Sequence, residues 1–339
     1  MSEALAATAT ALEPTVPDEP VFFDPSTLPW TPGPLERTWF KLLNINPESG
    51  GSTMLLRVAP ESRAAIHKHI GSVEGYIYEG EFAYGDDKGA AHSYLYEENG
   101  SIHEPTSGVG FEAFLLSRGA TIGFHPNGDP AVSIDAAVYY QLAKANGAAN
   151  HLKRFDAIYG DARRSLHNPF AHLVSDTGGT GAGQLVASAP SSVKERRPDR
   201  RAFTDTNDIP WAPWVMEGTW FKLLHLNNET GGWSMMLKVR PGQKAVIHHH
   251  IGSIEGFMVE GEFGYGEADR GAAGAYVYEA AEALHTPNTE SGFTMFTVFN
   301  GPIAGYDDAG RLSGIVDQDV MLQLARDHNA VQHLMGDSA

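Results

Sequence analysis

"IHKHIGSVEGYIYEG" (residues 66–80) and "IHHHIGSIEGFMVEG" (residues 247–261) occur in the two halves of one chain of 339 residues. In each stretch, two histidines are separated by a single residue, and a glutamate follows five residues after the second histidine. The surrounding residues are mostly apolar, aromatic or glycine. Because the arrangement occurs twice, an internal duplication has to be considered before secondary structure is assigned.

The duplication extends well beyond these stretches. "WFKLL" at residues 39–43 returns at residues 220–224, which is 181 positions later (220 − 39 = 181). "YLYE" at residues 94–97 corresponds to "YVYE" at residues 276–279, which is 182 positions later (276 − 94 = 182). The second copy therefore gains one residue between these segments, and the insertion predicts a loop in the stretch before Tyr94.

The length suits two domains of roughly 100 to 200 residues each. We predict an N-terminal domain at residues 21–174 and a C-terminal domain at residues 202–339. Residues 175–201 are rich in Gly, Ser, Pro and clustered basic residues, which predicts a flexible linker. Residues 1–20 are interpreted as a disordered leader.

Composition narrows the partners and the chemistry. The formal net charge of −18 argues against nucleic acid and anionic membrane surfaces as partners. The first 20 residues have no basic n-region, and no later stretch has the roughly 18 apolar residues of a membrane span, so we expect a cytoplasmic protein. Cysteine is absent. Any metal site must therefore use histidine nitrogen and carboxylate oxygen.

The predicted fold class is all-β. Runs rich in Val, Ile, Tyr, Phe and Met are broken by Gly, Pro, Asn and Asp about every 8 to 12 residues, which is typical of an antiparallel sandwich or barrel. "EGYIYEGEFAYG" and "FEAFLLSRG" are examples of predicted strands. Apolar residues recur at three and four positions in residues 138–152 and 320–334, so one helix is predicted at the end of each barrel.

The paired histidines predict a metal-binding site on one face of a strand. Side chains alternate along a strand, so His67 and His69 point to one face and Lys68 to the other. The second copy has the same pattern with His248 and His250, which excludes the intervening His249 from the site. A third ligand is expected from a neighbouring strand, and the downstream histidines are His103 and His285, 34 and 35 residues after the second histidine of each pair.

These residues resemble the cupin family, whose first motif places HxH before a glutamate and whose second motif supplies another histidine. "HKHIGSVE" and "HHHIGSIE" match the first motif, although Gly80 and Gly261 come one residue earlier than in the common form. "SYLYEENGSIHEP" and "AYVYEAAEALHTP" are similar to the acetylacetone dioxygenase and 2,4'-dihydroxyacetophenone dioxygenase group of cupins.

The resemblance implies two tandem jelly-roll (double-stranded β-helix) barrels, each with a C-terminal helix. It implies one Fe(II) per barrel held by three histidines, a small carbonyl substrate, and O2. Imidazole ligands also accept Mn, Zn or Ni. Packing of the two barrels against each other is expected, and homo-oligomer formation stays open. The implied ligand sets are His67, His69 and His103 in the first barrel, and His248, His250 and His285 in the second.

The glutamates of the two motifs receive different interpretations. Glu74 and Glu255 stand where many cupins place a fourth ligand, so each is a fourth ligand or a residue that supports the ligands. Glu97 and Glu279 are interpreted as pocket carboxylates that orient the substrate or accept its enolising proton.

Aromatic residues near the paired histidines are candidates for the pocket wall. If Glu74 faces the barrel interior, alternation places Tyr76 and Tyr78 on the same face. Phe257 is the counterpart in the second copy. Their differences predict that the two pockets do not accept identical ligands.

The leading hypothesis is therefore a non-haem Fe(II) dioxygenase that cleaves a C–C bond of a small β-diketone or hydroxyaryl ketone. A metal-binding sensor or regulatory module without turnover is the alternative from another class. Within enzymes, a Mn or Zn cupin isomerase or hydrolase stays open. A purely structural bicupin is disfavoured, because it would not need to keep the ligand spacing in both copies.

Overall fold

The computed structural model describes residues 14, 21–125, 127–159, 193–196, 201–307 and 309–334. The described residues form two compact units. We call residues 26–208 the N-terminal barrel. The chain up to Pro25 together with residues 209 onward is the C-terminal barrel.

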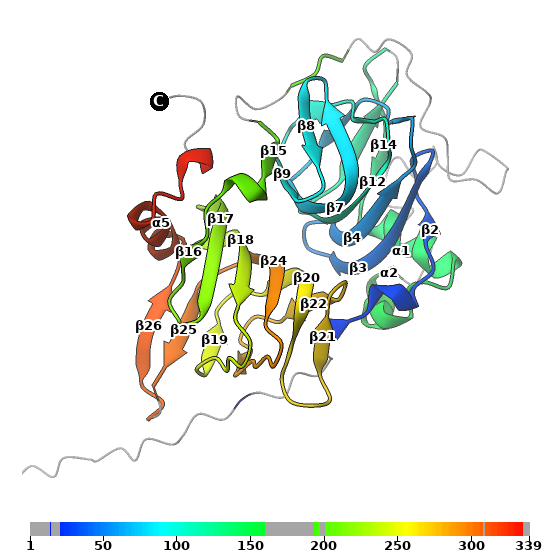
Figure 1. The fold of residues 1–339 in the computed structure, drawn as a ribbon. Coiled ribbons are helices and arrows are strands. Elements are labelled where there is room, and N and C mark those ends of the chain that lie inside the picture. The colour runs from blue at the N-terminus through cyan, green and yellow to red at the C-terminus, as the bar shows by residue number, and fades with distance from the viewer. Residues whose placement is uncertain are drawn as a thin grey trace, which may run out of the picture. The chain divides into compact units, whose positions relative to one another are not determined.

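The N-terminal barrel contains a ten-stranded and a four-stranded antiparallel sheet (Figure 1). The larger sheet has the strand order β15-β9-β7-β12-β4-β3-β2, with β5, β8 and β11 paired beside this path, and the smaller sheet has the order β10-β6-β13-β14. The strands are β2 (Thr31–Pro32), β3 (Thr38–Asn46), β4 (Gly51–Val58), β5 (Ser62–Arg63), β6 (His67–His69), β7 (Val73–Tyr84), β8 (Asp87–Ala90), β9 (Ser93–Glu97), β10 (Ile102–His103), β11 (Thr106–Ser107), β12 (Phe111–Ser117), β13 (Thr121–Phe124), β14 (Pro130–Ile134) and β15 (Phe203–Asp205).

The C-terminal barrel repeats this architecture with an eight-stranded and a four-stranded sheet. The larger sheet has the order β1-β22-β20-β24-β18-β17-β16, with β21 paired to β20, and the smaller sheet has the order β23-β19-β25-β26. The strands are β1 (Phe22–Phe23), β16 (Ala212–Pro213), β17 (Thr219–Asn227), β18 (Gly232–Val239), β19 (His248–His250), β20 (Ile254–Gly264), β21 (Arg270–Ala272), β22 (Tyr276–Glu279), β23 (Leu284–His285), β24 (Phe293–Phe299), β25 (Ile303–Tyr306) and β26 (Leu312–Val316). The predicted all-β class with two tandem barrels is confirmed.

In each barrel, one edge strand of the large sheet comes from the segment that precedes the other barrel in the sequence. β1 pairs with β22 in the register Phe22 to Val277, and β15 pairs with β9 in the register Phe203 to Leu95. The Phe22 ring packs edge-on against Phe263 at a centroid distance of 4.7 Å. Burial of an aromatic side chain stabilises such short edge strands. The two units therefore differ from the predicted domain boundaries in the segments 21–25 and 202–208.

A helix follows the last strand of each barrel, as predicted, but it is shorter than predicted. α1 (Ala136–Ala145) is capped by Asp135, which accepts a hydrogen bond from the Val138 N–H at 3.1 Å. α5 (Gln318–Asp327) has the equivalent cap. Gly147 and Asn329 follow these helices with φ of 68° and 55°, and this left-handed conformation ends an α-helix.

The remaining helical segments are short. They are α2 (Asp156–Tyr159) and the 3-10 helices η1 (Pro25–Thr27), η2 (Asn150–Phe155), η3 (Thr206–Asp208) and η4 (Gln332–Leu334). None of the helices in the described ranges has the length and apolar composition required to cross a bilayer.

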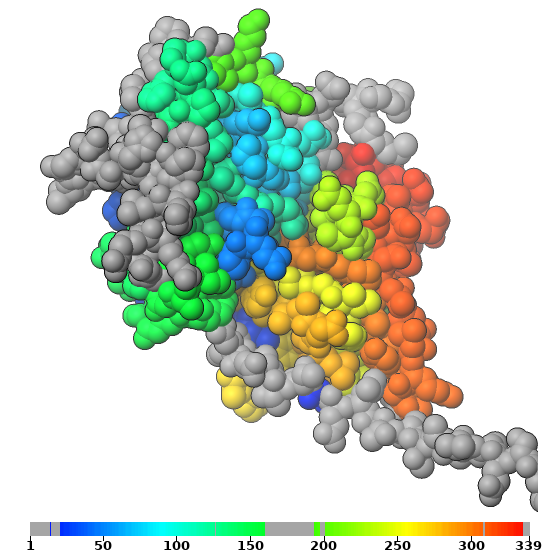
Figure 2. Space-filling view, turned by 180° about the vertical axis from the view of Figure 1, so that it is seen from behind, coloured from blue at the N-terminus to red at the C-terminus, as the bar shows by residue number. Residues whose placement is uncertain are grey.

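Apolar side chains from both sheets and the helix form the core of the C-terminal barrel. Met258 from β20, Ile303 from β25 and Met321 from α5 belong to one buried cluster. Figure 2 shows the last strands and α5 as a continuous orange-to-red surface of this barrel. The core thus anchors the small sheet, which carries the paired histidines.

Apart from residue 14, the predicted leader lies outside the described residues, as does most of the predicted linker. Residues 193–196 of the predicted linker are described, and Arg196 exchanges two backbone hydrogen bonds of 2.9 Å with Ile102. Here the chain extends the small sheet of the N-terminal barrel beyond β10.

Candidate metal centres

The small sheet of the N-terminal barrel brings three histidines together. His67 and His69 lie on β6, and β10 pairs with β6 so that His103 stands opposite His67. Nε2 of His103 is 3.0 Å from Nε2 of His69 and 3.2 Å from Nε2 of His67. Two donor atoms that are each about 2.1 Å from one ion, at right angles, are about 3.0 Å apart. The spacing therefore fits three ligands on one face of a metal ion.

Hydrogen bonding also prepares the triad to bind a metal. The Nδ1–H of His67 donates to the carbonyl oxygen of Ala65 at 2.8 Å, which leaves the lone pair of a neutral ring on Nε2. Burial, with the neighbouring His103 and His69 rings, holds the pKa of His67 well below its usual value. The ring is therefore neutral at physiological pH, which is the form that binds metals.

The C-terminal barrel repeats this arrangement with His248, His250 and His285. Nε2 of His250 is 2.6 Å from Nε2 of His285, and the Nδ1–H of His248 donates to the Val246 carbonyl at 2.9 Å. Burial lowers the pKa of His285 to about 4. Burial, followed by the neighbouring His285, lowers the pKa of His248 to about 4 as well. Both buried triads could hold a metal ion.

The structure places the predicted pocket carboxylates directly beside the triads. Oε2 of Glu97 lies 2.9 Å from Nε2 of His69. In the second barrel, Oε2 of Glu279 lies 3.2 Å from Nε2 of His250. Both carboxylates are buried. Burial raises the pKa of Glu279, the direction expected for a carboxyl group removed from water.

A tyrosine holds each of these carboxylates, and sequence reasoning missed it. The hydroxyl of Tyr84 donates to Oε1 of Glu97, and Tyr265 does the same for Glu279. The Tyr84 ring also stacks on His103 with a centroid distance of 4.3 Å. Each tyrosine thus connects the carboxylate with a histidine of the triad.

Glu74 and Glu255 lie elsewhere, so the structure does not bring them to the triads. Glu74 is 1% exposed and forms an ion pair of 2.9 Å with Arg118, while its other oxygen accepts a hydrogen bond of 3.0 Å from Tyr94. Glu255 accepts a hydrogen bond of 2.6 Å from Tyr276. Both carboxylates therefore have hydrogen-bond partners away from the triads. The preceding residues Val73 and Ile254 line the cavities, so Glu74 and Glu255 lie on the opposite face of their strands.

The predicted pocket wall of Tyr76, Tyr78 and Phe257 is corrected for the same reason. None of the three lines either of the two cavities that contain the paired histidines. The hydroxyl of Tyr76 hydrogen-bonds Nδ1 of His92 at 2.8 Å, and that of Tyr78 donates to Glu112 at 2.9 Å. The assumption that Glu74 faces the barrel interior was wrong, and for that reason the alternation argument also assigned Tyr76 and Tyr78 to the wrong face.

A β-bulge explains which residues of β7 do reach the pocket. The register of β7 against β12 shifts between the pairs of Ile77 and Glu79. Val73 lines the cavity before the bulge, and Phe82 and Tyr84 line it after the bulge, so the inward face changes from odd to even positions. β20 has the same irregularity.

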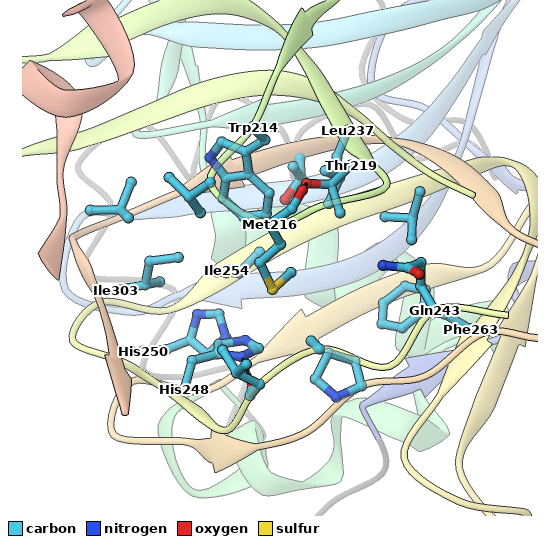
Figure 3. A pocket seen from close by; sticks show the side chains of 18 of the residues that line it. Trp214, Met216, Thr219, Leu237, Gln243, His248, His250, Ile254, Phe263 and Ile303 are labelled. Carbon is cyan, nitrogen blue, oxygen red and sulfur yellow. Dashed lines mark hydrogen bonds between the residues drawn. The ribbon is translucent and has the colours of Figure 1, made fainter. Parts of the chain in front are cut away.

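Each triad opens on a cavity within its own barrel. The cavity of the C-terminal barrel is shown in Figure 3, where Met216, Ile254 and Ile303 surround the hollow that contains His248 and His250. The cavity of the N-terminal barrel contains His67, His69 and Glu97 in the corresponding places. The arrangement can hold a metal-bound small molecule between three imidazoles, one carboxylate and an apolar wall.

Two barrels with one histidine triad each define a bicupin architecture with two candidate metal centres. The chain belongs to the ChrR cupin-like domain family, whose model matches residues 18–121 and 199–304. It is also 33% identical over 119 residues to the acetylacetone-cleaving enzyme of Acinetobacter johnsonii, which covers 32% of this chain and 76% of that protein.

Solved structures share the fold across most of the chain. A candidate dioxygenase from Nostoc punctiforme PCC 73102 superimposes with a TM-score of 0.55 and 16% identity, covering 91% of this chain and 90% of that one. A deletion mutant of Bacillus subtilis oxalate decarboxylase has a TM-score of 0.51 and 13% identity, covering 96% and 86% of the two chains. At these identities the likeness concerns the fold.

Proposed function

We propose that this protein is a non-haem Fe(II) dioxygenase that uses O2 to cleave a C–C bond of a small β-diketone or hydroxyaryl ketone. The observation that carries the proposal is the histidine triad with a carboxylate beside one of its ligand atoms, at 2.9 Å in one barrel and 3.2 Å in the other. The identity to an acetylacetone-cleaving enzyme supports the same substrate class.

The three histidines of each barrel would hold the iron. Three neutral imidazoles would add no charge to a bound Fe(II), which would then supply Lewis-acid and redox chemistry for a carbonyl substrate and O2. The proposed ligands are His67, His69 and His103, and His248, His250 and His285.

Glu97 and Glu279 are the proposed proton acceptors. A β-diketone binds a metal best as its enolate, so a proton must leave the carbon between the carbonyl groups. In each barrel the buried carboxylate is beside the triad and within reach of a molecule bound there. The hydroxyls of Tyr84 and Tyr265 donate a hydrogen bond to Oε1 of the carboxylate in their barrel. Oε2 of each carboxylate then faces the histidines.

Oxygen uptake tests the proposal. Iron-loaded protein is expected to consume one O2 per acetylacetone or 2,4'-dihydroxyacetophenone cleaved. The double variant His67→Ala with His248→Ala is expected to lose this activity while keeping its circular dichroism spectrum. His249→Ala is the matched control, because His249 contacts Glu282 outside the triad.

Turnover that persists in the double variant would contradict the proposed site. Metal and ketone binding without any O2 consumption would instead favour a metal-binding module that does not catalyse a reaction.

A further inference from the structure

The two cavities differ threefold in size although the triads are alike. The cavity beside His248 and His250 has a volume of about 450 Å³, and the one beside His67 and His69 has about 150 Å³. Ligand pockets for drug-sized molecules are usually about 300 to 1,000 Å³, whereas a cavity of about 150 Å³ holds a molecule the size of benzene. The volumes therefore separate two ligand size classes.

Two substitutions between the repeats place bulkier side chains against the N-terminal cavity. Leu115 lines the N-terminal cavity where the C-terminal barrel has the smaller Thr297. Tyr139 also lines the N-terminal cavity, and its ring packs against Phe40 at 5.0 Å. Its counterpart, Met321, lies 3.1 Å from Nε1 of Trp214.

The two cavities also differ in polarity beside the second histidine of each pair. Ser52, Ser117 and Thr121 line the N-terminal cavity. The corresponding residues of the C-terminal barrel are Trp233, Phe299 and Ile303, and the first two are stacked rings 4.4 Å apart.

The hydrogen bonding of that histidine changes accordingly. Thr121 Oγ1 is 3.4 Å from Nδ1 of His69. Nδ1 of His250 is buried and has no hydrogen-bond partner among the described residues. The surroundings of His250 Nδ1 are therefore more apolar than those of His69 Nδ1.

The rim of the larger cavity continues the apolar character outward. Val215, Val246 and Ile315 line it and are 48%, 55% and 49% exposed. Their counterparts in the N-terminal barrel are Pro34, Ala65 and Ser133. An exposed apolar rim that leads into an apolar cavity is typical of an entrance for an apolar ligand.

We propose that the two centres have different substrates: the C-terminal barrel accepts ketones with an aryl or long alkyl arm, and the N-terminal barrel accepts short-chain ketones only. This assignment rests on the proposed function, because it divides that ketone substrate class between the two sites. Leu115 and Tyr139 exclude the arm from one barrel, and Thr297 together with the apolar rim admits it to the other.

Calorimetric titration of the full-length, metal-loaded protein with acetophenone in the absence of O2 tests the assignment. One ketone is expected to bind per chain. Thr297→Leu, which copies the N-terminal barrel, is expected to weaken binding at least tenfold. Val215→Glu places a charge on the exposed rim without altering the core and is expected to weaken binding similarly. The control is Val109→Glu, because Val109 is 61% exposed and lines neither cavity.

The converse variant is Leu115→Thr with Tyr139→Met, which is expected to create a second acetophenone site per chain. Two equal sites in the unmodified protein, no acetophenone site at all, or a single site that resists both Thr297→Leu and Val215→Glu would overturn the assignment. Binding is read without turnover, so a protein that binds one acetophenone in this pattern but consumes no O2 would refute the proposed dioxygenase and leave the division of ligands standing.

Discussion

The Glu97 carboxylate lies 2.9 Å from Nε2 of His69, whereas Glu74, the glutamate of the first cupin motif, pairs with Arg118. Glu279 and His250 repeat this relationship in the second barrel at 3.2 Å. If the carboxylates are proton acceptors, changing both to glutamine removes the base and keeps the shape. We expect Glu97→Gln with Glu279→Gln to lower kcat by about 100-fold or more, since positioned general bases typically contribute that much.

Metal content measured on the same samples decides how these carboxylates act. An unchanged metal content with lost turnover is the expected result. Loss of metal in proportion to activity would show that the carboxylates are ligands and not bases. Glu112→Gln is the matched control, since Glu112 pairs with Arg57 and Tyr78 outside the cavity.

The tyrosines that hold the carboxylates are expected to matter for rate. Tyr84→Phe with Tyr265→Phe removes one hydrogen bond from each carboxylate, and bonds to charged groups are worth about 1.5 to 3 kcal/mol. We expect kcat to fall about tenfold and the pH profile of kcat to move. Tyr78→Phe removes a hydroxyl that donates outside the pocket and should leave both unchanged. If Tyr78→Phe lowered kcat as much as the Tyr84→Phe, Tyr265→Phe double variant, the hydroxyls would act only through protein stability.

Arg118 is expected to be important for stability and not for metal binding. Its guanidinium pairs with the buried Glu74, and removing the partner leaves a buried charge uncompensated. Tyr94 still donates to Glu74, so we expect Arg118→Ala to lower the free energy of unfolding by about 2 kcal/mol, below the full cost of an isolated buried charge. Urea unfolding measures the loss, with Asn300→Ala at the equivalent position as control. Loss of metal from the N-terminal triad without loss of stability would contradict this role.

The metal-free protein is expected to become less stable at mildly acidic pH. Burial lowers the pKa of His285 from the ordinary 6.5 to about 4. Between these values the unfolded chain binds a proton that the folded ring does not, so stability is complete above about pH 6.5 and falls as the pH drops toward 4. Urea unfolding of chelator-treated protein at several pH values measures this slope. His285→Gln removes one of the histidines with a lowered pKa and should reduce this slope, and an unchanged slope in that variant would contradict the assignment.

Much of the metal centre was predictable from sequence because it depends on local geometry. Alternation along a strand placed His67 and His69 on one face, and the observed pairing of His103 opposite His67 follows from a neighbouring strand of the same sheet. The one-residue difference between the repeats falls in the loop between β20 and β21, where the insertion had predicted it. Pattern and spacing were sufficient for these features.

The predictions that were wrong or missing concern features that strand alternation does not determine. The bulge in β7 reverses the inward face, so Tyr84 reaches Glu97 although Tyr76 and Tyr78 point away from the pocket. The edge strands β1 and β15 pair far along the chain, and a strand of two or three residues carries no signal of its partner. The unequal cavity volumes could not be predicted either, because substitutions such as Leu115 for Thr297 change the cavity only through packing.

The most direct test of the central claim is the metal content of protein purified without oxygen and without chelators, measured by elemental mass spectrometry. Two triads that each hold Fe(II) predict close to two iron atoms per chain, and about one in the variant His67→Ala with His69→Ala. Absence of any bound transition metal, even after anaerobic reconstitution with Fe(II), would contradict the account.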